Sequence, residues 1–531
     1  MPYNLADLFE HSVDAMPERT ALICGDRSVS YRELDEQANR TAYRLTELGL
    51  GPGTHVGIQM HNSVETMASI LAVLKIRAVP ITVNFRYTAD ELAYLYGNAD
   101  MRAVLCHREY AGAALSAAAD APVLDHVIVV DDLDLGSLTA TRDFGPRSTD
   151  DLVLIYTGGT TGRPKGVMWR QEDLWRVLGG GIDFYTGTAV EDEHHQSRTG
   201  AVGEPMRWFI LPTLMHTSAL MPTLTALFSG NTVVLEPRFD AERVWEVVQQ
   251  QHPHVLVITG DAMGRPLIES CRRTRPDTTG LVAVASGAAL FSTALKDAFL
   301  EEFENLVVSD SVGSSETGFG GIGFAAKGVR QPGGPRVGAG RGTLVLDDAD
   351  RPIAPGGGEG RLAKSGNIPL GYYNDPVKTA ELFREVDGMR VVVTGDRARV
   401  EDDGSVTLLG RGNMVINTGG EKVFTEEVES AVKSHPAVYD AVVLGVPDER
   451  WGHRVAAVVQ PRHGAVVDFA SLEVHLRGCL AGYKIPRSVW VTDRVERTPS
   501  GKPDFRWAQR HVETHAAAFV AGTDRVAVTE R

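Results

Sequence analysis

Apolar residues recur at helical spacing near the start of the chain and predict an amphipathic helix over residues 30–49. Ser30 and Glu33 form a capping-box pattern at its beginning, and Gly49 and Gly51 mark its end. The apolar positions that share one face are Leu34, Ala38, Ala42, Leu45 and Leu48. This stretch should therefore be a surface helix packed on a core.

Shorter apolar runs follow, and their lengths predict strands that alternate with helices. The expected order is a strand at 55–58, a helix at 66–75 and a strand at 78–83. Further on we expect a helix at 241–250 with Val244, Trp245, Val247 and Val248 inward, a strand at 254–259, and a strand at 282–289 that ends in small residues. Near the C-terminus, Thr425 should cap a helix that ends at Ser434, before strands at 441–444 and 455–459. The alternation predicts an α/β fold.

Two polar stretches interrupt this pattern. Residues 131–150 are expected to form a surface connection. Residues 186–206 contain Glu191-Asp192-Glu193-His194-His195, whose paired histidines could bind a metal. The sequence shows no third ligand for them, so a solvated loop is the simpler interpretation.

Composition narrows the class of protein. The chain has 531 residues, 43% of them hydrophobic and 23% charged, as in an ordinary globular protein of about three or four domain-sized units. Its formal net charge of −16 argues against a nucleic-acid partner. No apolar run approaches the roughly 20 residues of a membrane span, and no signal peptide is apparent. Four widely separated cysteines favour free thiols in a reducing cytoplasm.

The clearest chemical signal is the loop Tyr156–Gly166, Tyr-Thr-Gly-Gly-Thr-Thr-Gly-Arg-Pro-Lys-Gly. It follows the apolar run Leu152–Ile155, which reads as a buried strand. Glycine backbone, threonine hydroxyls and Lys165 together suit a polyphosphate. Pro164 precedes Lys165 and no Ser or Thr follows it, so the loop is not a Walker A motif. The structural alternative is a glycine turn between two elements.

The loop resembles the phosphate loop of the adenylate-forming superfamily, which includes acyl-CoA synthetases, adenylation domains and luciferases. Other blocks resemble the family's motifs in the same order over roughly residues 10–505. They are Leu211–His216, Ser309–Gly318, Gly371–Pro376, Val393–Asp396, Leu409–Lys422 and Arg497–Lys502. Each block alone is weak, but their shared order makes coincidence an unsatisfactory explanation.

The resemblance implies an ATP site. Its residues would be Thr157, Gly158, Gly159, Thr160, Thr161, Gly162, Lys165, Gly287, Ala288, Ala289, Asp310, Ser311, Val312, Gly313, Ser314, Ser315, Asp396 and Arg411. Asp396 would bind the ribose hydroxyls, although a Thr-Gly-Asp turn is common without such a role. The chain departs from the family at Gly159, where serine is frequent, at Ser315, where threonine is usual, and at Val312, where an aromatic residue usually stacks on adenine.

The resemblance also implies the catalytic groups. Lys502 would bridge carboxylate and α-phosphate, Glu316 would bind Mg²⁺ together with Thr160, and His216 would line the acyl carboxylate pocket. Gly287 and Gly313 would contact the substrate with His216. Without the other motifs, His216 would be read as a core histidine and Lys502 as an exposed lysine in a turn.

The family's architecture implies a large N-terminal multi-layer α/β domain over 1–410, a hinge at 411–414 and a small mobile α+β C-terminal domain over 415–531. Asn413 would be the pivot. The CoA contacts would be Gly419, Gly420, Glu421 and Lys422. The block Gly371–Pro376 is expected to have a structural role.

These resemblances imply an ATP-dependent, AMP-forming acyl-CoA synthetase that uses Mg²⁺ and CoA. Several stretches, among them Lys165–Arg170 and Gly366–Tyr372, resemble actinobacterial ligases of steroid side-chain carboxylates, which suggests a bulky apolar acid; a medium- or long-chain fatty acid is next. Alternatives are a diazotase-type enzyme that adenylates nitrite for an aryl amine, an adenylation enzyme that loads a carrier protein, and a non-catalytic acyl- or nucleotide-binding protein. A homodimer is compatible with the sequence.

Overall fold

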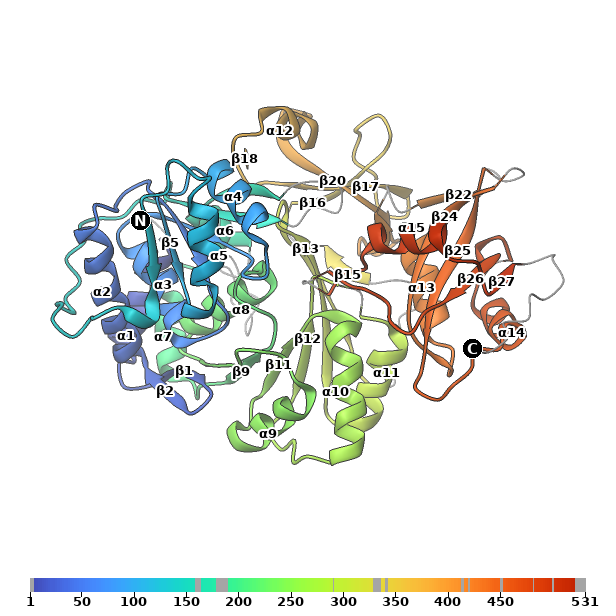
Figure 1. The fold of residues 1–531 in the computed structure, drawn as a ribbon, viewed down its shortest axis with the longest axis horizontal. Coiled ribbons are helices and arrows are strands. Elements are labelled where there is room, and N and C mark those ends of the chain that lie inside the picture. Colours follow the sequence, from blue (N-terminus) through green and yellow to red (C-terminus); the bar gives the residue numbers. More distant parts are fainter. Residues whose placement is uncertain are drawn as a thin grey trace.

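The chain folds around three β-sheets (Figure 1). The computed structural model describes residues 4–157, 164–177, 190–289, 291–327, 336–339, 342–411, 415–418, 421–448, 452–480, 482–498 and 501–520. The N-terminal sheet and its helices lie at one end of the molecule, the longest sheet lies in the middle, and the C-terminal sheet lies at the other end (Figure 1).

The first sheet has seven strands in the order β18-β8-β7-β4-β3-β5-β6. Their bounds are β3 His55–Gln59, β4 Val79–Thr82, β5 Ala103–Cys106, β6 His126–Val129, β7 Leu152–Thr157, β8 Lys165–Arg170 and β18 Gly371–Tyr372. The helices of this part of the chain are α1 Leu5–Ala15, α2 Tyr31–Glu47, α3 Val64–Lys75, α4 Ala89–Asn98, α5 Arg108–Ala118, the short turn η1 Val130–Asp132, α6 Gln171–Trp175 and α7 His195–Val202.

The second sheet has fourteen strands in the order β16-β17-β20-β21-β15-β14-β13-β12-β11-β9-β10-β1-β2, with β19 paired to β20. Its strands are β1 Thr20–Cys24, β2 Arg27–Ser30, β9 Arg207–Ile210, β10 Thr232–Leu235, β11 Val255–Ile258, β12 Ala283–Ser286, β13 Val307–Ser314, β14 Gly318–Ala325, β15 Arg336–Ala339, β16 Thr343–Leu346, β17 Gly358–Ser365, β19 Phe383–Val386, β20 Met389–Val400 and β21 Val406–Arg411. Its helices are α8 Thr217–Phe228, α9 Ala241–Gln251, α10 Gly260–Thr274, α11 Thr293–Glu302 and α12 Pro376–Leu382.

The third sheet has six strands, in the order β23-β22-β25-β26-β27 with β24 paired to β25. The strands are β22 Val415–Thr418, β23 Glu421–Phe424, β24 Val438–Asp448, β25 Gly452–Pro461, β26 Ser488–Val491 and β27 Phe519–Val520, and the helices are α13 Thr425–Lys433, α14 Phe469–Cys479, η4 Gly482–Lys484 and α15 Phe505–Thr514. The change from the second sheet to the third falls between Arg411 and Val415. That stretch is where we expect the hinge, which stays a prediction.

The periodic segments have the structures that their patterns predict. Ser30 caps α2, and its hydroxyl and the Glu33 carboxylate complete a capping box. The apolar face expected for α9 is the buried one, with Val244, Trp245 and their partners inside. The mixed α/β fold, with a large N-terminal part and a small C-terminal part, is confirmed.

Two local expectations are wrong. Residues 195–202 form helix α7 rather than a loop, and Gln196 and Ser197 are buried in it. The sequence did not predict this helix, because its buried positions are polar and so give no helical pattern of apolar residues. Thr425 is the first residue of α13 and not its cap; Phe424 holds the cap position, without a side-chain hydrogen bond.

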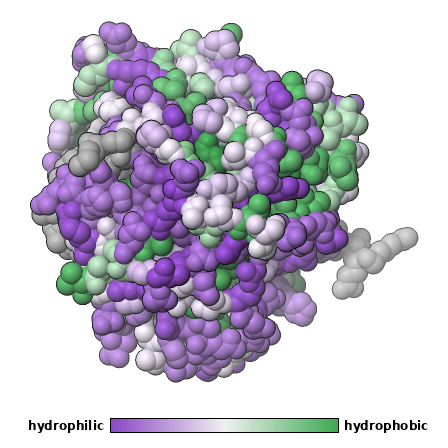
Figure 2. All heavy atoms as spheres, turned by 90° about the vertical axis from the view of Figure 1, so that its left-hand side faces the viewer, coloured by the Kyte–Doolittle hydropathy of each residue, from purple (hydrophilic) through white to green (hydrophobic). Residues whose placement is uncertain are grey.

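Hydrophilic residues cover most of the end of the molecule that the N-terminal helices form, with small hydrophobic areas between them (Figure 2). In the described part of the chain, no helix combines the length and the apolar character that crossing a bilayer requires.

Candidate active site

Strands β9, β11, β12 and β13 are parallel neighbours, so their carboxyl ends lie at one edge of the second sheet. Open α/β sheets bind ligands at such an edge. The loops after these strands line a cavity of about 1730 Å³, together with Thr157 at the end of β7 and Lys502 from the C-terminal part. Topology thus brings together motifs that lie far apart in the sequence.

The phosphate loop is described only at its two ends. Thr157 lines the cavity, and Lys165 begins β8. Lys165 pairs with the carboxylate of Asp375, and its ammonium group lies 5.7 Å from the centre of the Tyr372 ring. Gly158, Gly159, Thr160, Thr161 and Gly162 lie outside the described residues, so their expected contacts stay predictions.

Glu316 lies in the turn between β13 and β14 and lines the cavity. The backbone N–H of Glu316 donates to Ser314 Oγ at 3.2 Å, and Trp169 Nε1 donates to the carbonyl of Ser315 at 2.8 Å. Tyr372 donates its hydroxyl to Glu316 Oε1 at 2.9 Å. The turn and the carboxylate are therefore both held in place.

Tyr372 and Asp375 are site residues that the sequence reasoning missed. Both belong to the block Gly371–Pro376, for which we expected a structural role, yet they contact Glu316 and Lys165. The reason is that β18 pairs with β8 and so lies beside the C-terminal end of the phosphate loop, which the structure describes. The only signal in the sequence was that the block itself resembles a family motif.

Most of the other ATP-site candidates line the cavity. They are Gly287, Ala288, Ser311, Val312, Gly313, Ser314 and Ser315. A side chain at Gly287 would start 2.6 Å from Ser311 Oγ, and one at Gly313 would start 2.3 Å from the carbonyl of Gly318. Gly313 therefore needs glycine, because a backbone carbonyl cannot yield, whereas at Gly287 the hydroxyl of Ser311 would have to rotate.

Two candidates on these strands do not line the cavity. Asp310 instead pairs with Lys296 at 2.5 Å. Burial raises the pKa of Asp310, although the ammonium of Lys296 opposes the shift. Ala289 lies just beyond the lining residues Gly287 and Ala288. The expected ATP contact of Asp310 stays a prediction, and in this structure its side chain pairs with Lys296.

Asp396 and Arg411 lie opposite each other in the register of β20 and β21. Asp396 is not among the described residues that line the cavity, and the side chain of Arg411 lies outside the description. Their roles at the ribose and phosphates stay predictions.

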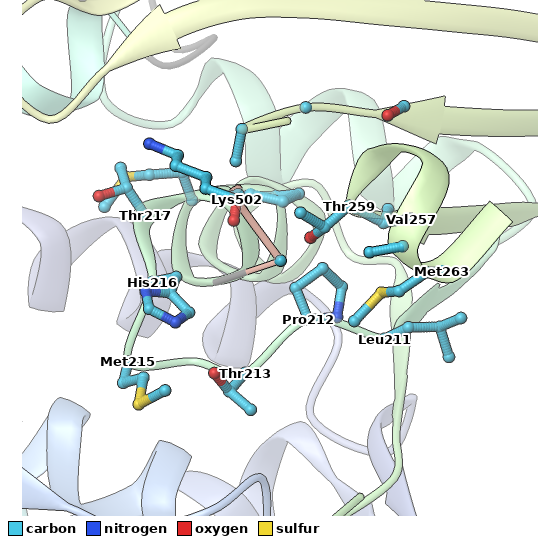
Figure 3. A pocket seen from close by; sticks show the side chains of 18 of the residues that line it. Leu211, Pro212, Thr213, Met215, His216, Thr217, Val257, Thr259, Met263 and Lys502 are labelled. Carbon is cyan, nitrogen blue, oxygen red and sulfur yellow. The ribbon is translucent and has the colours of Figure 1, made fainter. Parts of the chain in front are cut away.

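His216 is the residue that precedes α8, and its ring lies at the cavity wall (Figure 3). Burial lowers the pKa of His216 to about 4, and the positive charges of Lys502 and Arg86 add to this effect. The ring is therefore neutral at pH 7. Its Nε2 is buried without a hydrogen-bond partner in the described part of the chain.

Lys502 lies in a tight turn of the C-terminal part, and its side chain extends on the same side of the cavity as Thr217 and His216 (Figure 3). The Lys502 carbonyl accepts a bond from Thr498 N at 2.8 Å, and Lys502 N donates to Thr498 Oγ1 at 3.2 Å. Arg497 supports the turn by donating to the Gly501 carbonyl at 3.0 Å. Arg497 is itself fixed by an ion pair with Asp440 at 2.6 Å.

Helix α10 of the large part holds the small part in this position. Lys433 of α13 lies 2.9 Å from Asp261, and both side chains are buried. Arg462 lies 2.6 Å from Glu269, and the guanidinium of Arg265 lies 5.6 Å from the centre of the Tyr439 ring. Burial raises the pKa of Asp261, but Lys433 and the N–H of Ser292 outweigh it, so the net pKa is lowered.

The cavity also extends along one face of α8. Lining positions there are Thr217, Ser218, Met221, Pro222, Thr225 and Ala226, and the flanking residues His216 and Ser229 line it as well. Because the 12 residues of α8 rise 1.5 Å each, this branch is about 18 Å long. The facing wall is apolar and includes Val255, Val257, Ala283 and Ala285.

The expected CoA and hinge residues are described only in part. Asn413, Gly419 and Gly420 lie outside the described residues. Glu421 and Lys422 begin β23, which pairs with β22. Their contacts with CoA stay predictions.

Comparison with known proteins agrees with this geometry. Residues 9–373 match the family described as AMP-binding enzyme, and residues 427–502 match the AMP-binding enzyme C-terminal domain. The chain belongs to the AMP-binding enzyme family, and the resemblance seen in the sequence is confirmed.

Relatives that match over nearly their full length are named as CoA ligases. The chain is 47% identical to the 3-oxocholest-4-en-26-oate–CoA ligase of Rhodococcus rhodochrous, over 96% of each chain. It is 46% identical to the medium/long-chain-fatty-acid–CoA/3-oxocholest-4-en-26-oate–CoA ligase of Mycolicibacterium smegmatis, over 97% of this chain and 98% of the relative. The crystal structure of ATP-bound MatB from Rhodopseudomonas palustris superimposes with a TM-score of 0.82 at 26% identity, over 96% of this chain and 99% of that one.

Proposed function

We propose that this chain is an ATP-dependent acyl-CoA synthetase that converts a long, largely apolar carboxylic acid into its CoA thioester through an acyl-adenylate. It is an AMP-forming acid–thiol ligase. One observation carries the proposal above all: Lys502, Glu316, His216 and Thr157, from four separate motifs, line one cavity with a long apolar branch. The full-length relatives, all of them CoA ligases, support the same reaction.

Lys502 would reduce the charge repulsion that opposes the first half-reaction. The acid's carboxylate must attack the α-phosphate of ATP, and two like charges 4 Å apart repel by about 4 kcal/mol at an effective dielectric constant of about 20. An ammonium group between them replaces this repulsion with attraction as negative charge develops. Pyrophosphate leaves, and the acid is joined to AMP. No nucleophilic side chain takes part.

The residues around Glu316 fit a magnesium ion. Magnesium takes few protein ligands, and these are hard oxygen atoms. Glu316 offers a carboxylate at the cavity wall, already oriented by Tyr372 at 2.9 Å. Bound there, Mg²⁺ would neutralise charge on the phosphates of ATP. We assign Glu316 as its protein ligand, with Thr160 as a second candidate.

Neutral His216 suits the carboxyl end of the acid. An imidazole with a pKa of about 4 adds no charge at pH 7, so it does not compete with Lys502 for the carboxylate. It fixes the beginning of the acyl branch, because it directly precedes α8. The acid's carboxyl group would thus lie between His216 and Lys502.

The acyl branch favours a long acid over a short one. It follows α8 for about 18 Å. Its apolar lining comes from Met221, Pro222 and Ala226 of α8 and from β11 and β12, and hydroxyl residues of α8 lie among them. Its far end is more polar, with Ser229 and Asn231. An acid that carries an oxygen far from its carboxylate would suit this end, and so we place steroid side-chain acids first and medium- to long-chain fatty acids second.

The second half-reaction requires the C-terminal part to move. A thiol attacks the carbonyl of the adenylate, and Lys502 has no part in that step. We propose that rotation about 411–414, with Asn413 as the pivot, withdraws Lys502 and brings residues 419–422 to the thiol. The ion pairs between α10 and the C-terminal part would break in this movement.

Mass spectrometry of the products tests the proposal. The enzyme is incubated with MgATP and a panel of acids (a 3-oxo steroid side-chain acid and fatty acids of graded length), with and without CoA. AMP and a CoA thioester are expected, with the long acids preferred. An arm with nitrite and an aryl amine is included: a diazonium product without any thioester would make the CoA assignment wrong.

A further inference from the structure

A cluster of metal-ligand side chains lies outside the cavity, where α1 meets α7. His11 of α1 and the adjacent residues Glu193 and His194 place their ligand atoms within 4.8 Å of one another. The two imidazole rings lie with their centres 3.8 Å apart. The sequence showed no third ligand for the pair His194-His195; the fold instead groups His194 with Glu193 and with His11, and His195 is not part of this cluster.

Among the residues that the structure describes, the Glu193 carboxylate has no strong partner. Only 11% of its side chain is exposed. Within the described ranges, the basic group closest to it is His194 Nε2 at 3.8 Å, which is longer than a hydrogen bond. A carboxylate removed from water is costly unless a cation or hydrogen-bond donors compensate it. A cation between the three side chains would satisfy the carboxylate and both rings at once.

Hydrogen bonds around the cluster hold the backbone that carries its ligands. Asp192 Oδ1 accepts the N–H of His194 at 2.8 Å, and the same carboxylate pairs with Arg198 at 2.8 Å. Helix α7 is anchored at both ends: Trp175 Nε1 donates to Gln196 Oε1 at 3.0 Å, and Arg19 donates to the Gly200 carbonyl at 2.8 Å. A site on packed helices needs less ordering when the ion binds.

The chemistry of the donors selects the ion. Two imidazole nitrogens and one carboxylate oxygen suit zinc and its neighbours in the first transition row, whereas magnesium and calcium prefer oxygen ligands. Tetrahedral ligands about 2 Å from zinc lie roughly 3.3 Å from each other, so the ligand atoms must approach the ion while the two imidazole rings, whose centres are 3.8 Å apart, turn away from each other. His194 has a 47% exposed side chain that can move, and this exposure leaves a fourth position for water.

We propose that His11, Glu193 and His194 form a binding site for a divalent transition-metal ion of the zinc type, which fastens α1 to α7. The site is separate from the magnesium position at Glu316, since none of the three residues lines the cavity. Its role is structural. Helix α7 leads directly into β9, whose Trp208 lines the cavity, so the ion steadies one wall of the acyl branch.

Zinc titration of the full, tag-free, metal-stripped chain against a chromophoric zinc chelator tests this proposal. Wild type should bind one ion that His11→Asn and His194→Asn each weaken at least 100-fold. His195→Asn is the matched control: it removes the neighbouring histidine, which is not in the cluster, and should bind as wild type does.

A second measurement separates lost binding from lost folding. Zinc should raise the melting temperature of wild type and His195→Asn, since an ion that binds only the folded state stabilises it, and should leave His11→Asn unchanged. Acyl-CoA synthesis by all variants in the presence of MgATP reports that they are folded. Equal zinc affinity in wild type and His11→Asn, or no binding by wild type at micromolar zinc, would overturn the proposal.

Discussion

The ammonium group of Lys433 lies 2.9 Å from the carboxylate of Asp261, and with side-chain exposures of only 2% and 6% this ion pair joins the small C-terminal part to the large one. Asp261 also lines the cavity and accepts the N–H of Ser292 at 2.7 Å. The arrangement that places Lys502 in the cavity therefore depends on a buried charge pair. A single substitution that removes this pair therefore tests that arrangement.

Replacing Asp261 with asparagine should impair adenylate formation more than thioester formation. Removing one partner of a buried ion pair costs about 3–5 kcal/mol, and here that cost falls on the arrangement with Lys502 in place. We expect ATP–pyrophosphate exchange to slow at least tenfold, while CoA thioester formation from supplied acyl-adenylate persists. Glu473→Gln, which breaks an exposed pair with Arg477 within α14, is the control. An equal loss in both half-reactions would indicate general damage instead.

Lys502→Ala should abolish the first half-reaction and spare the second. The ammonium stabilises charge that develops only as the adenylate forms, and loss of one such group typically costs about 10²–10³-fold in rate. Pyrophosphate exchange measures the first step, and thioester formation from synthetic acyl-adenylate measures the second. If pyrophosphate exchange survives the substitution, Lys502 does not have the role assigned to it.

Tyr372→Phe should weaken the use of magnesium without removing the ligand itself. The lost hydroxyl orients Glu316, and residues that orient a metal ligand typically contribute about 10–100-fold in metal affinity. The measurement is the Mg²⁺ concentration for half-maximal rate at saturating acid. Tyr373→Phe is the matched control, because the hydroxyl of Tyr373 donates to Asp100 and not to Glu316. The same Mg²⁺ requirement in both variants would contradict the assignment.

Ala283 and Ala285 offer a test of the acyl branch. Both line it on β12, with Ala283 about 7 Å further from the carboxyl edge. Ala283→Phe should exclude long and steroid acids while short acids still react, whereas Ala285→Phe should exclude medium-length acids as well. The measurement is kcat/KM for fatty acids of graded length, compared between each variant and wild type. Uniform loss over all lengths in both variants would show that the acid lies elsewhere.

His216 should make the protein less stable in mild acid. Its pKa is about 4 when folded, below the ordinary histidine value of 6.5. Between these pH values the unfolded chain binds a proton that the folded chain does not, so stability falls as the pH is lowered. From pH 7 to pH 4.5, wild type should lose roughly 2 kcal/mol more unfolding free energy than His216→Gln. Urea unfolding at the two pH values measures the difference, and equal losses would mean that the ring is not buried as described.

Local sequence was sufficient for much of the fold. The capping box of α2 and the buried face of α9 depend on contacts within a few residues, so pattern alone identifies them. The order of the ATP motifs is likewise available from the sequence, because each motif is a short run of neighbouring residues. The class of enzyme therefore followed from the sequence.

Contacts between residues far apart in the chain were decided only by the tertiary structure. Tyr372 contacts Glu316 because β18 pairs with β8, Lys433 contacts Asp261 because α13 packs near α10, and His11 contacts His194 across α1 and α7. The ion pair of Asp310 with Lys296 is a further contact that the motif around Asp310 did not predict. Spacing along the chain constrains neighbours in a helix or strand, whereas the packing of whole elements determines which distant side chains meet.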